Sequence, residues 1–248
     1  MKRFLPYISF LLLFASCSTQ NYLMESDKEK KALLSQLDTA FFYNPQYQYQ
    51  LRVDDKINIS VWGQEDLSVG SVYSIYNSNE VYGKWLLVDM EGNIEIPKVG
   101  TTNVKGMTII EIKKMLKSKF GEWVVNPIVD VKVLNKEITI LGEVRNPGVL
   151  QVDKDRNTLL EIIAKSGGIE DYADLGFVKV LRQEGEHVRV AGINLTKSGD
   201  FAQKNIQLHP GDVVIVPSKG HKEFDRRVST IIPFTTTITA AAILMGTF

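Results

Sequence analysis

The chain has 248 residues, of which 44% are hydrophobic and 23% are charged, and its 29 lysines and arginines equal its 29 aspartates and glutamates. A net charge of zero argues against binding to nucleic acid and against attachment to anionic lipid through a basic face. One cysteine cannot form a disulfide within the chain, so the fold must rest on its own hydrophobic core. The length allows two modest domains or one large domain.

The start of the chain has the layout of a bacterial lipoprotein signal. Lys2 and Arg3 precede an apolar run at 4–14, and two small residues separate this run from Cys17. The run is shorter than the roughly 20 residues that a helix needs to span a bilayer, which disfavours a transmembrane anchor with an incidental thiol. We therefore expect residues 1–16 to be removed as a signal peptide and the nucleophilic thiol of Cys17 to be lipidated.

The segment 17–44 is expected to be a lipidated N-terminus and tether. Residues 20–31 are polar and mixed in charge without an apolar period, which is typical of a flexible spacer or a frayed helix. Ser18 and Thr19 are uncharged, which resembles the outer-membrane address of lipoproteins rather than an inner-membrane retention signal. The tether would keep the folded domains at a distance from the membrane.

Alternation of apolar and polar residues then predicts the strands of a first domain. Residues 49–53 and 57–62 are expected to form two strands that meet at an acidic turn, Asp54–Asp55. Within 85–97, the turn-forming residues 89–93 separate two apolar runs. This pattern predicts a β-hairpin, whose second strand ends at its proline.

A capped helix and one more strand complete this domain. Thr108 and Glu111 form the pattern of a capping box, and the apolar residues after them recur at helical spacing up to Phe120. Residues 128–133 alternate again. We therefore predict a compact unit of strands, one hairpin, one helix and a final strand.

The second half of the chain has the order of a small β-grasp domain, with a strand pair, a helix across it and further strands. The helix begins after Asn157–Thr158 and ends at Gly167–Gly168, because glycine readily takes the left-handed conformation that closes helices. The expected fold class is therefore α+β, a small first domain followed by a β-grasp domain. The predicted strands of the second half are 136–141, 149–152, 178–181, 187–193 and the apolar run that follows the turn in 208–216.

One short pattern occurs in both halves. Residues 51–59 and 208–216 both run Leu, two residues, a turn residue, Asp and then an apolar strand. We interpret this echo as recurrent turn chemistry rather than as duplication of a domain.

The order of these motifs resembles two known domains. Residues 49–63 and 88–100 are similar to the polysaccharide biosynthesis/export domain. Residues 140–148, 159–168 and 210–212 are similar to the soluble-ligand-binding β-grasp (SLBB) domain. Behind a lipoprotein signal, this order resembles the Wza-like outer-membrane polysaccharide export lipoproteins.

Two departures from the family pattern are visible. The first turn has Asp54–Asp55 where the family usually has Gly-Asp, and residues 70–83 form a longer connection that is rich in tyrosine and asparagine. The chain also has one SLBB domain where the best-known members have two. We therefore expect a shorter periplasmic part.

The resemblance implies an outer-membrane lipoprotein, anchored on the periplasmic side, that forms a ring-shaped homo-oligomer and exports capsular polysaccharide or exopolysaccharide. Its implied partners are the polysaccharide, outer-membrane lipid and a tyrosine-kinase-like polysaccharide co-polymerase of the inner membrane. The implied domains are an export domain at 45–134, an SLBB domain at 135–218, and a linker with a C-terminal membrane helix at 219–248. The alternative is a monomeric periplasmic glycan-binding lipoprotein without a pore.

The C-terminal residues 228–248 carry no charge. On a helix from Phe234, apolar residues fall on one arc and threonines on the other. In a ring of such helices the threonines would line a water-filled pore, whereas the alternative is a helix packed on the core of the protein itself. The candidate pore-lining residues are Thr235, Thr236, Thr239 and Thr247, and the candidate lipid-facing residues are Phe234, Ile238, Ala241, Leu244, Met245 and Phe248.

The sequence offers little support for catalysis. Its three histidines lack the i, i+4 pairing of a helical metal site, and it has neither a Gly-x-Ser-x-Gly elbow nor a phosphate-binding glycine loop. We therefore expect no enzyme activity, no cofactor and no bound metal. Tyr73, Tyr76 and Tyr82 are candidate glycan contacts, whereas Trp62 and Trp85 are expected in a core or an interface.

Overall fold

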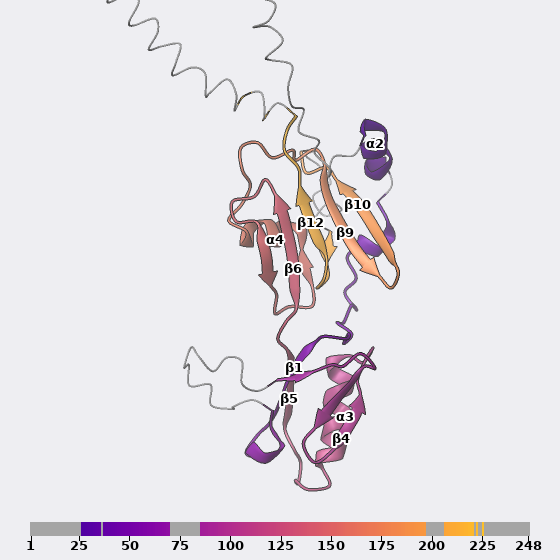
Figure 1. Ribbon diagram of the computed structural model, residues 1–248, viewed down its shortest axis with the longest axis vertical. Helices are drawn as coiled ribbons and strands as arrows, with labels where there is room; N and C mark the ends of the chain where they lie inside the picture. The colour runs from indigo at the N-terminus through magenta and orange to yellow at the C-terminus, as the bar shows by residue number, and fades with distance from the viewer. Residues whose placement is uncertain are drawn as a thin grey trace, which may run out of the picture.

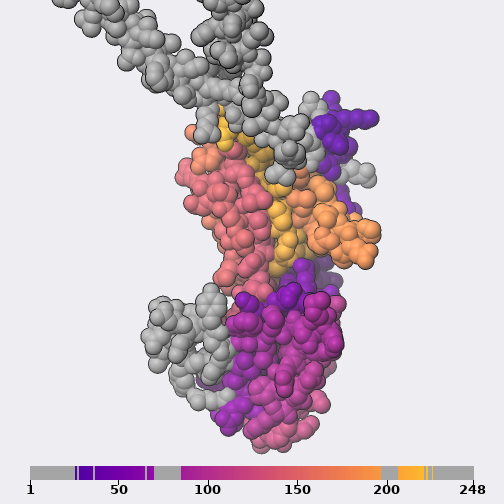
Figure 2. Space-filling view, viewed as in Figure 1, coloured from indigo at the N-terminus to yellow at the C-terminus, as the bar shows by residue number. Residues whose placement is uncertain are grey.

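The computed structural model describes residues 26–35, 37–69, 85–196, 206–220, 222 and 225. These residues form two domains, one above the other in Figure 1, which appear as two lobes in Figure 2. Each domain has its own hydrophobic core. The mixture of helices and sheets confirms the α+β class. None of the helices in this part of the chain is long and apolar enough to cross a membrane.

The first domain is built on a three-stranded antiparallel sheet. Its strands are β1 (Lys56–Val61), β2 (Leu86–Leu87) and β5 (Val129–Val133), in the order β2-β1-β5. Every second residue of β1 is buried, as the alternation in its sequence predicts. Helix α3 (Ile109–Phe120) packs against β5 and buries one residue in every four. Both hydrogen bonds of the predicted capping box at Thr108 are present.

The hairpin predicted at 85–97 is wrong. Strand β2 pairs with β1, whereas β3 (Asn93–Ile96) pairs with β4 (Gly100–Asn103). Lys98 and Gly100 have left-handed backbones, with φ of 61° and 81°, and this conformation closes the tight turn between β3 and β4. The residues that were expected to end a strand therefore reverse the chain.

The structure also corrects one predicted strand of the first domain and narrows the alternatives for Trp62. Residues 49–53, predicted as a strand, contribute only one isolated bridge, from Gln50 to Thr108. Trp62 has 68% of its surface exposed, so it is not a core residue. A short 3-10 helix, η2 (Glu65–Leu67), follows it.

The second domain has a β-grasp arrangement. Its five-stranded sheet has the order β10-β9-β12-β6-β7, in which β12 runs parallel to β6 and the other neighbours are antiparallel. Helix α4 (Leu159–Lys165) buries Leu159, Ile162 and Ile163 in the core. The sheet strands are β6 (Glu137–Gly142), β7 (Gly148–Gln151), β9 (Val178–Glu184), β10 (His187–Ile193) and β12 (Val213–Val216), and β8 (Asn157–Thr158) pairs separately with β11 (Gln207–Leu208).

The segment that precedes the first domain packs on the second domain. Helix α2 (Asp27–Ser35) lies against β10 in Figure 1, and the 3-10 helix η1 (Thr39–Phe41) follows. Phe41 is fully buried in the core of the second domain. The described C-terminal part of the expected tether thus packs on a folded domain. We call residues 37–47 the strap.

Candidate functional site at the domain junction

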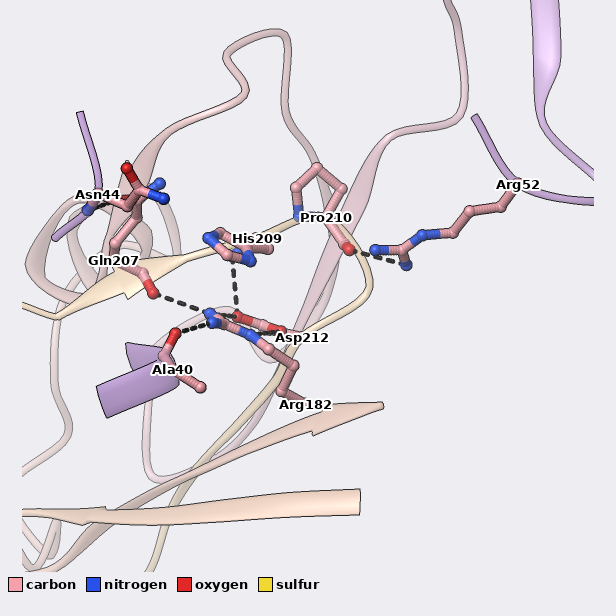
Figure 3. A network of polar contacts seen from close by, with 8 residues as sticks. All are labelled: Ala40, Asn44, Arg52, Arg182, Gln207, His209, Pro210 and Asp212. Carbon is pink, nitrogen blue, oxygen red and sulfur yellow. Dashed lines mark hydrogen bonds and ion pairs between the residues drawn. The ribbon is translucent and has the colours of Figure 1, made fainter. Parts of the chain in front are cut away.

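The site residues predicted from the sequence all lie outside the described part of the chain. These are the lipidation site, the tyrosines of the long connection and the C-terminal helix. They comprise Cys17, Tyr73, Tyr76, Tyr82 and residues 234–248. A cluster of buried polar contacts lies instead at the junction between the two domains, as Figure 3 shows.

Two turns of the same kind, one from each domain, meet at this junction. Their aspartates, Asp55 and Asp212, each accept a hydrogen bond of 2.8 Å from the backbone N–H three residues earlier, which belongs to Arg52 in the first turn and to His209 in the second. The residue just before each aspartate has a left-handed backbone, with φ of 68° in the first turn and 94° in the second. The echo in the sequence is therefore shared turn chemistry, in which a carboxylate satisfies a backbone donor.

Arg182, on β9, connects the second turn to the strap (Figure 3). Its guanidinium donates to both carboxylate oxygens of Asp212, with 2.9 Å from Nε to Oδ1 and 2.7 Å from Nη2 to Oδ2. It also donates to the backbone carbonyls of Gln207 and of Ala40 in the strap. Both charged side chains are buried, so each offsets part of the desolvation cost of the other. Burial raises the pKa of Asp212, and Arg182 opposes that shift.

Asp55, in the first turn, has a neutral partner. The hydroxyl of Tyr49 donates to its carboxylate and lies 2.9 Å from one oxygen and 3.0 Å from the other. Burial raises the pKa of Asp55. Burial and the nearby negative charge of Asp55 also raise the pKa of Tyr49. The two turns therefore share a backbone but place different chemistry around the aspartate.

The two turns touch each other directly. Nη1 of Arg52 donates to the backbone carbonyl of Pro210 over 3.2 Å (Figure 3). A Cβ atom on Gly211 would lie only 2.9 Å from the same Nη1. Glycine at this position of the second turn therefore lets the first turn approach.

A stacked pair of rings closes the junction on the strap side. The ring centroids of Tyr47 and His209 are 3.6 Å apart, with 6° between the ring planes. Burial lowers the pKa of His209 to about 3, helped by the positive charges of Arg182 and Arg52. Burial also raises the pKa of Tyr47 to about 12. Both rings are therefore neutral near pH 7, which favours stacking.

Further hydrogen bonds fix the path of the strap. The backbone N–H of Asn44 donates to Oε1 of Gln207 over 2.7 Å (Figure 3). Nη1 of Arg156 donates to the carbonyl of Pro45 over 2.8 Å. The strap thus runs from the core of the second domain to the first domain along a path held by side chains of the second.

A groove of about 530 Å³ opens beside the paired turns, between the two domains. Tyr47 lines this groove and also a second one of about 400 Å³. The larger groove combines cations, amides and an aromatic ring, which is a composition suited to binding a polar ligand. Its polar side chains include Gln48, Gln50, Arg52, Lys105, Gln183 and Glu184.

The sequence contained one signal for this site. The repeated turn pattern marks Asp55 and Asp212, although nothing in it shows that the two turns meet. Arg182 carries no signal, because it is 30 residues from its partner and lies in an ordinary strand. The stacking of Tyr47 likewise depends on the path of the strap.

Comparison with known protein families identifies both domains. Residues 43–134 match the family described as polysaccharide biosynthesis/export protein, and residues 136–216 match the SLBB domain. The chain is thus of the class that joins a polysaccharide biosynthesis/export domain to an SLBB β-grasp domain. The first domain belongs to the polysaccharide biosynthesis/export family and the second to the SLBB family, as the resemblance of their motifs predicted.

Two curated relatives illustrate the family. The chain is 29% identical over 204 residues to the EPS I polysaccharide export outer membrane protein EpsA of Ralstonia solanacearum, a match that covers 75% of this chain and 53% of EpsA. It is 27% identical over 187 residues to the polysialic acid transport protein KpsD of Escherichia coli, which covers 72% of this chain and 29% of KpsD. The chain thus spans about half the length of EpsA and less than a third of KpsD.

Proposed function

We propose that this chain is an outer-membrane lipoprotein that forms a homo-oligomeric channel for capsular polysaccharide or exopolysaccharide. The observation that carries the proposal is the export domain followed directly by an SLBB domain. The lipoprotein signal predicted at the start of the sequence supports it. The names of the two relatives describe export and transport of polysaccharides, which supports the same role here. In this proposal the protein passes the glycan on and performs no chemistry on it.

The two ends of the described chain support one orientation. Helix α2 packs on the second domain, and near the other end the N–H of Lys219 donates to the carbonyl of Tyr172 over 2.7 Å. Both ends therefore leave from the second domain, at the top of Figure 1. Lipid on Cys17 and a membrane helix at 234–248 would then place the second domain next to the outer membrane. The export domain would point toward the inner membrane, where a tyrosine-kinase-like co-polymerase would deliver the glycan.

The junction suits a ring because it joins the two domains through several independent contacts. Protomers in a ring meet through two different surfaces, so a change in the angle between domains would misalign one layer of the ring against the other. The contact of Arg52 with Pro210 and the stack of Tyr47 on His209 oppose such a change. The Arg182–Asp212 pair holds the second turn and the strap in place on the second domain. We infer that the junction keeps the two layers aligned around one lumen.

The membrane pore in this proposal is formed by the C-terminal helices. Their threonines would face the lumen and their apolar residues the lipid, with every backbone hydrogen bond satisfied inside its own helix. The tyrosines between 73 and 82 would contact the glycan before it reaches the pore.

Oligomeric state and surface glycan together test the function. We expect the mature protein, extracted in mild detergent, to run as a closed oligomer in native mass measurements, and deletion of its gene to remove surface polysaccharide. Cys17→Ala should give a folded protein that is missing from the outer membrane. A strictly monomeric particle at high concentration would favour the monomeric glycan-binding lipoprotein, and normal surface glycan after deletion would exclude an export role.

A further inference from the structure

Two cations in the larger groove are not neutralised by the protein. Arg52 and Lys105 are both exposed, and among the described residues neither has a carboxylate within ion-pair distance. Arg52 uses one donor on the carbonyl of Pro210, which leaves the rest of its guanidinium available. Arg182, in contrast, is paired with Asp212 and also donates to two backbone carbonyls. The groove therefore presents positive charge that is available to a ligand.

Contacts fix the guanidinium of Arg52 and the backbone of Lys105. The guanidinium of Arg52 lies 5.5 Å from the ring centroid of Tyr49. The backbone N–H of Lys105 donates to the carbonyl of Gly92 over 3.2 Å, and a Cβ on Gly92 would come within 2.5 Å of the Cβ of Lys105. Side chains that start from a fixed backbone lose less freedom when they bind an anion.

The other charges of the groove are already paired. Glu184 forms an ion pair of 2.6 Å with Arg189, and Asp212 is neutralised by Arg182. The uncompensated charge of the groove is therefore positive. The lowered pKa of His209 agrees, since Arg182 and Arg52 contribute to it.

The remaining walls suit a saccharide. Gln48, Gln50 and Gln183 are exposed, and their amides offer both donors and acceptors to hydroxyl groups. Tyr47 adds an aromatic surface. The volume of about 530 Å³ falls within the range of small-molecule sites, roughly 300 to 1,000 Å³.

We propose that this groove binds a short stretch of an acidic polysaccharide, with Arg52 and Lys105 contacting the carboxylates of its sugars. A guanidinium can donate two parallel hydrogen bonds to a planar carboxylate, and an ammonium supplies a compact second charge. A neutral glycan would leave both cations without a partner. The proposal names a glycan class for the export function and rests on that function for its biological role.

The test compares an acidic with a neutral oligosaccharide of equal length. The full mature chain in mild detergent is titrated calorimetrically with hexagalacturonate and with maltohexaose at low salt. We expect saturable binding of hexagalacturonate that weakens as salt is added, and at least roughly tenfold weaker binding of maltohexaose. Lys105→Gln and Arg52→Gln should each weaken hexagalacturonate binding about three- to tenfold.

Lys114→Gln is the matched control. Lys114 is an exposed residue of α3, so this variant removes the same charge away from the groove and should bind like the wild type. Lys105→Gln is the decisive variant, because it leaves the contact between the turns intact, and thermal unfolding verifies its fold. Equal affinity for the two oligosaccharides, unchanged binding by Lys105→Gln, or an equal loss in Lys114→Gln overturns the proposal. Competition by inorganic phosphate at the same concentration as hexagalacturonate would reveal a generic anion site and overturn it as well.

The gene deletion separates this inference from the export function. Loss of surface polysaccharide on deletion, together with no binding of hexagalacturonate, removes the groove proposal and leaves the export role standing. Binding with the expected variant pattern, together with normal surface polysaccharide on deletion, removes the export role and leaves the groove standing.

Discussion

The two aspartate turns at the domain junction have the same local backbone but different partners. The carboxylate of Asp55 accepts from the hydroxyl of Tyr49, whereas the carboxylate of Asp212 forms two bonds with the guanidinium of Arg182. Each carboxylate also accepts from the backbone N–H three residues earlier. The turn motif therefore sets the local backbone geometry, and the partner of the aspartate determines which other segments of the chain the turn contacts.

The chemistry of the partner explains this difference in role. A phenol has one donor, which Tyr49 directs to its own domain. A guanidinium has five donors, and Arg182 directs them to Asp212, to the carbonyl of Gln207 and to the carbonyl of Ala40 in the strap. Only the second turn can therefore connect three segments that are distant in the sequence.

The largest expected difference between the two turns is in the free energy of unfolding that is lost when the partner of each aspartate is removed. Arg182→Met leaves the carboxylate of Asp212 buried without its counter-ion, so the free energy of unfolding should fall by about 3 to 5 kcal/mol. Tyr49→Phe removes the bond of a neutral donor to the carboxylate of Asp55, which keeps its bond to the N–H of Arg52, and should cost about 1.5 to 3 kcal/mol. Urea unfolding of the full chain in one detergent measures both. Equal losses in the two variants would show that the charge of the partner does not matter.

Substitutions at the left-handed position of each turn should change the free energy of unfolding by smaller amounts, with opposite signs in the two turns. Asp54→Gly relieves a φ of 68° and should raise the free energy of unfolding by about 0.5 kcal/mol. Gly211→Ala places a Cβ at a φ of 94° and within 2.9 Å of Nη1 of Arg52, so it should lower that free energy by about 1 to 2 kcal/mol. The same unfolding measurement applies.

Gly106→Ala is the control for this pair of substitutions. Gly106 has a φ of 80°, but a Cβ there would meet no atom within 4 Å, so this variant reports the backbone cost alone. Gly211→Ala should cost more than Gly106→Ala, by the amount that contact with the first turn adds. Equal costs would mean that the two turns do not pack tightly against each other.

Local features of this fold could be predicted from the sequence, because their causes are local. The capping box at Thr108 joins residues three positions apart, and the buried face of β1 follows from alternation. Strand pairing has no such local cause. Alternation shows which residues of β3 face inward but not that its partner is β4, which depends on the left-handed backbone of Lys98.

Only the local features of the domain junction could be predicted from the sequence. The repeated turn pattern marked both aspartates, because each carboxylate bonds a backbone group within its own turn. The strap could not be recognised, since Phe41 belongs to a short apolar stretch without a period. Its burial depends on a domain whose core residues begin at Ile138. Arg182 is an ordinary residue of an alternating strand until Asp212 and Ala40 are brought to it.

The position equivalent to Arg52 in the second turn is His209, and this gives the two turns different responses to pH. Arginine stays charged throughout the accessible range. Burial lowers the pKa of His209 to about 3, whereas an unfolded chain has a histidine pKa of about 6.5. Between these values the unfolded chain binds a proton that the folded chain does not, so stability should fall as pH falls below 6.5.

The smallest expected effect is therefore a pH-dependent difference between the wild type and His209→Phe, which keeps a ring for Tyr47 but cannot titrate. One group can change the free energy of unfolding by at most about 1.4 kcal/mol per pH unit, and the partial exposure of the imidazole should keep the slope well below that limit. Burial raises the pKa of Asp55 and Asp212, which favours the folded state in acid, but both proteins share these carboxylates and their contribution cancels in the difference. Urea midpoints measured from pH 8 to pH 4.5 should run parallel above pH 7 and diverge below 6.5, with the wild type losing more stability. Parallel curves over the whole range would mean that His209 accepts its proton in the folded state, and that the stack with Tyr47 does not depend on a neutral ring.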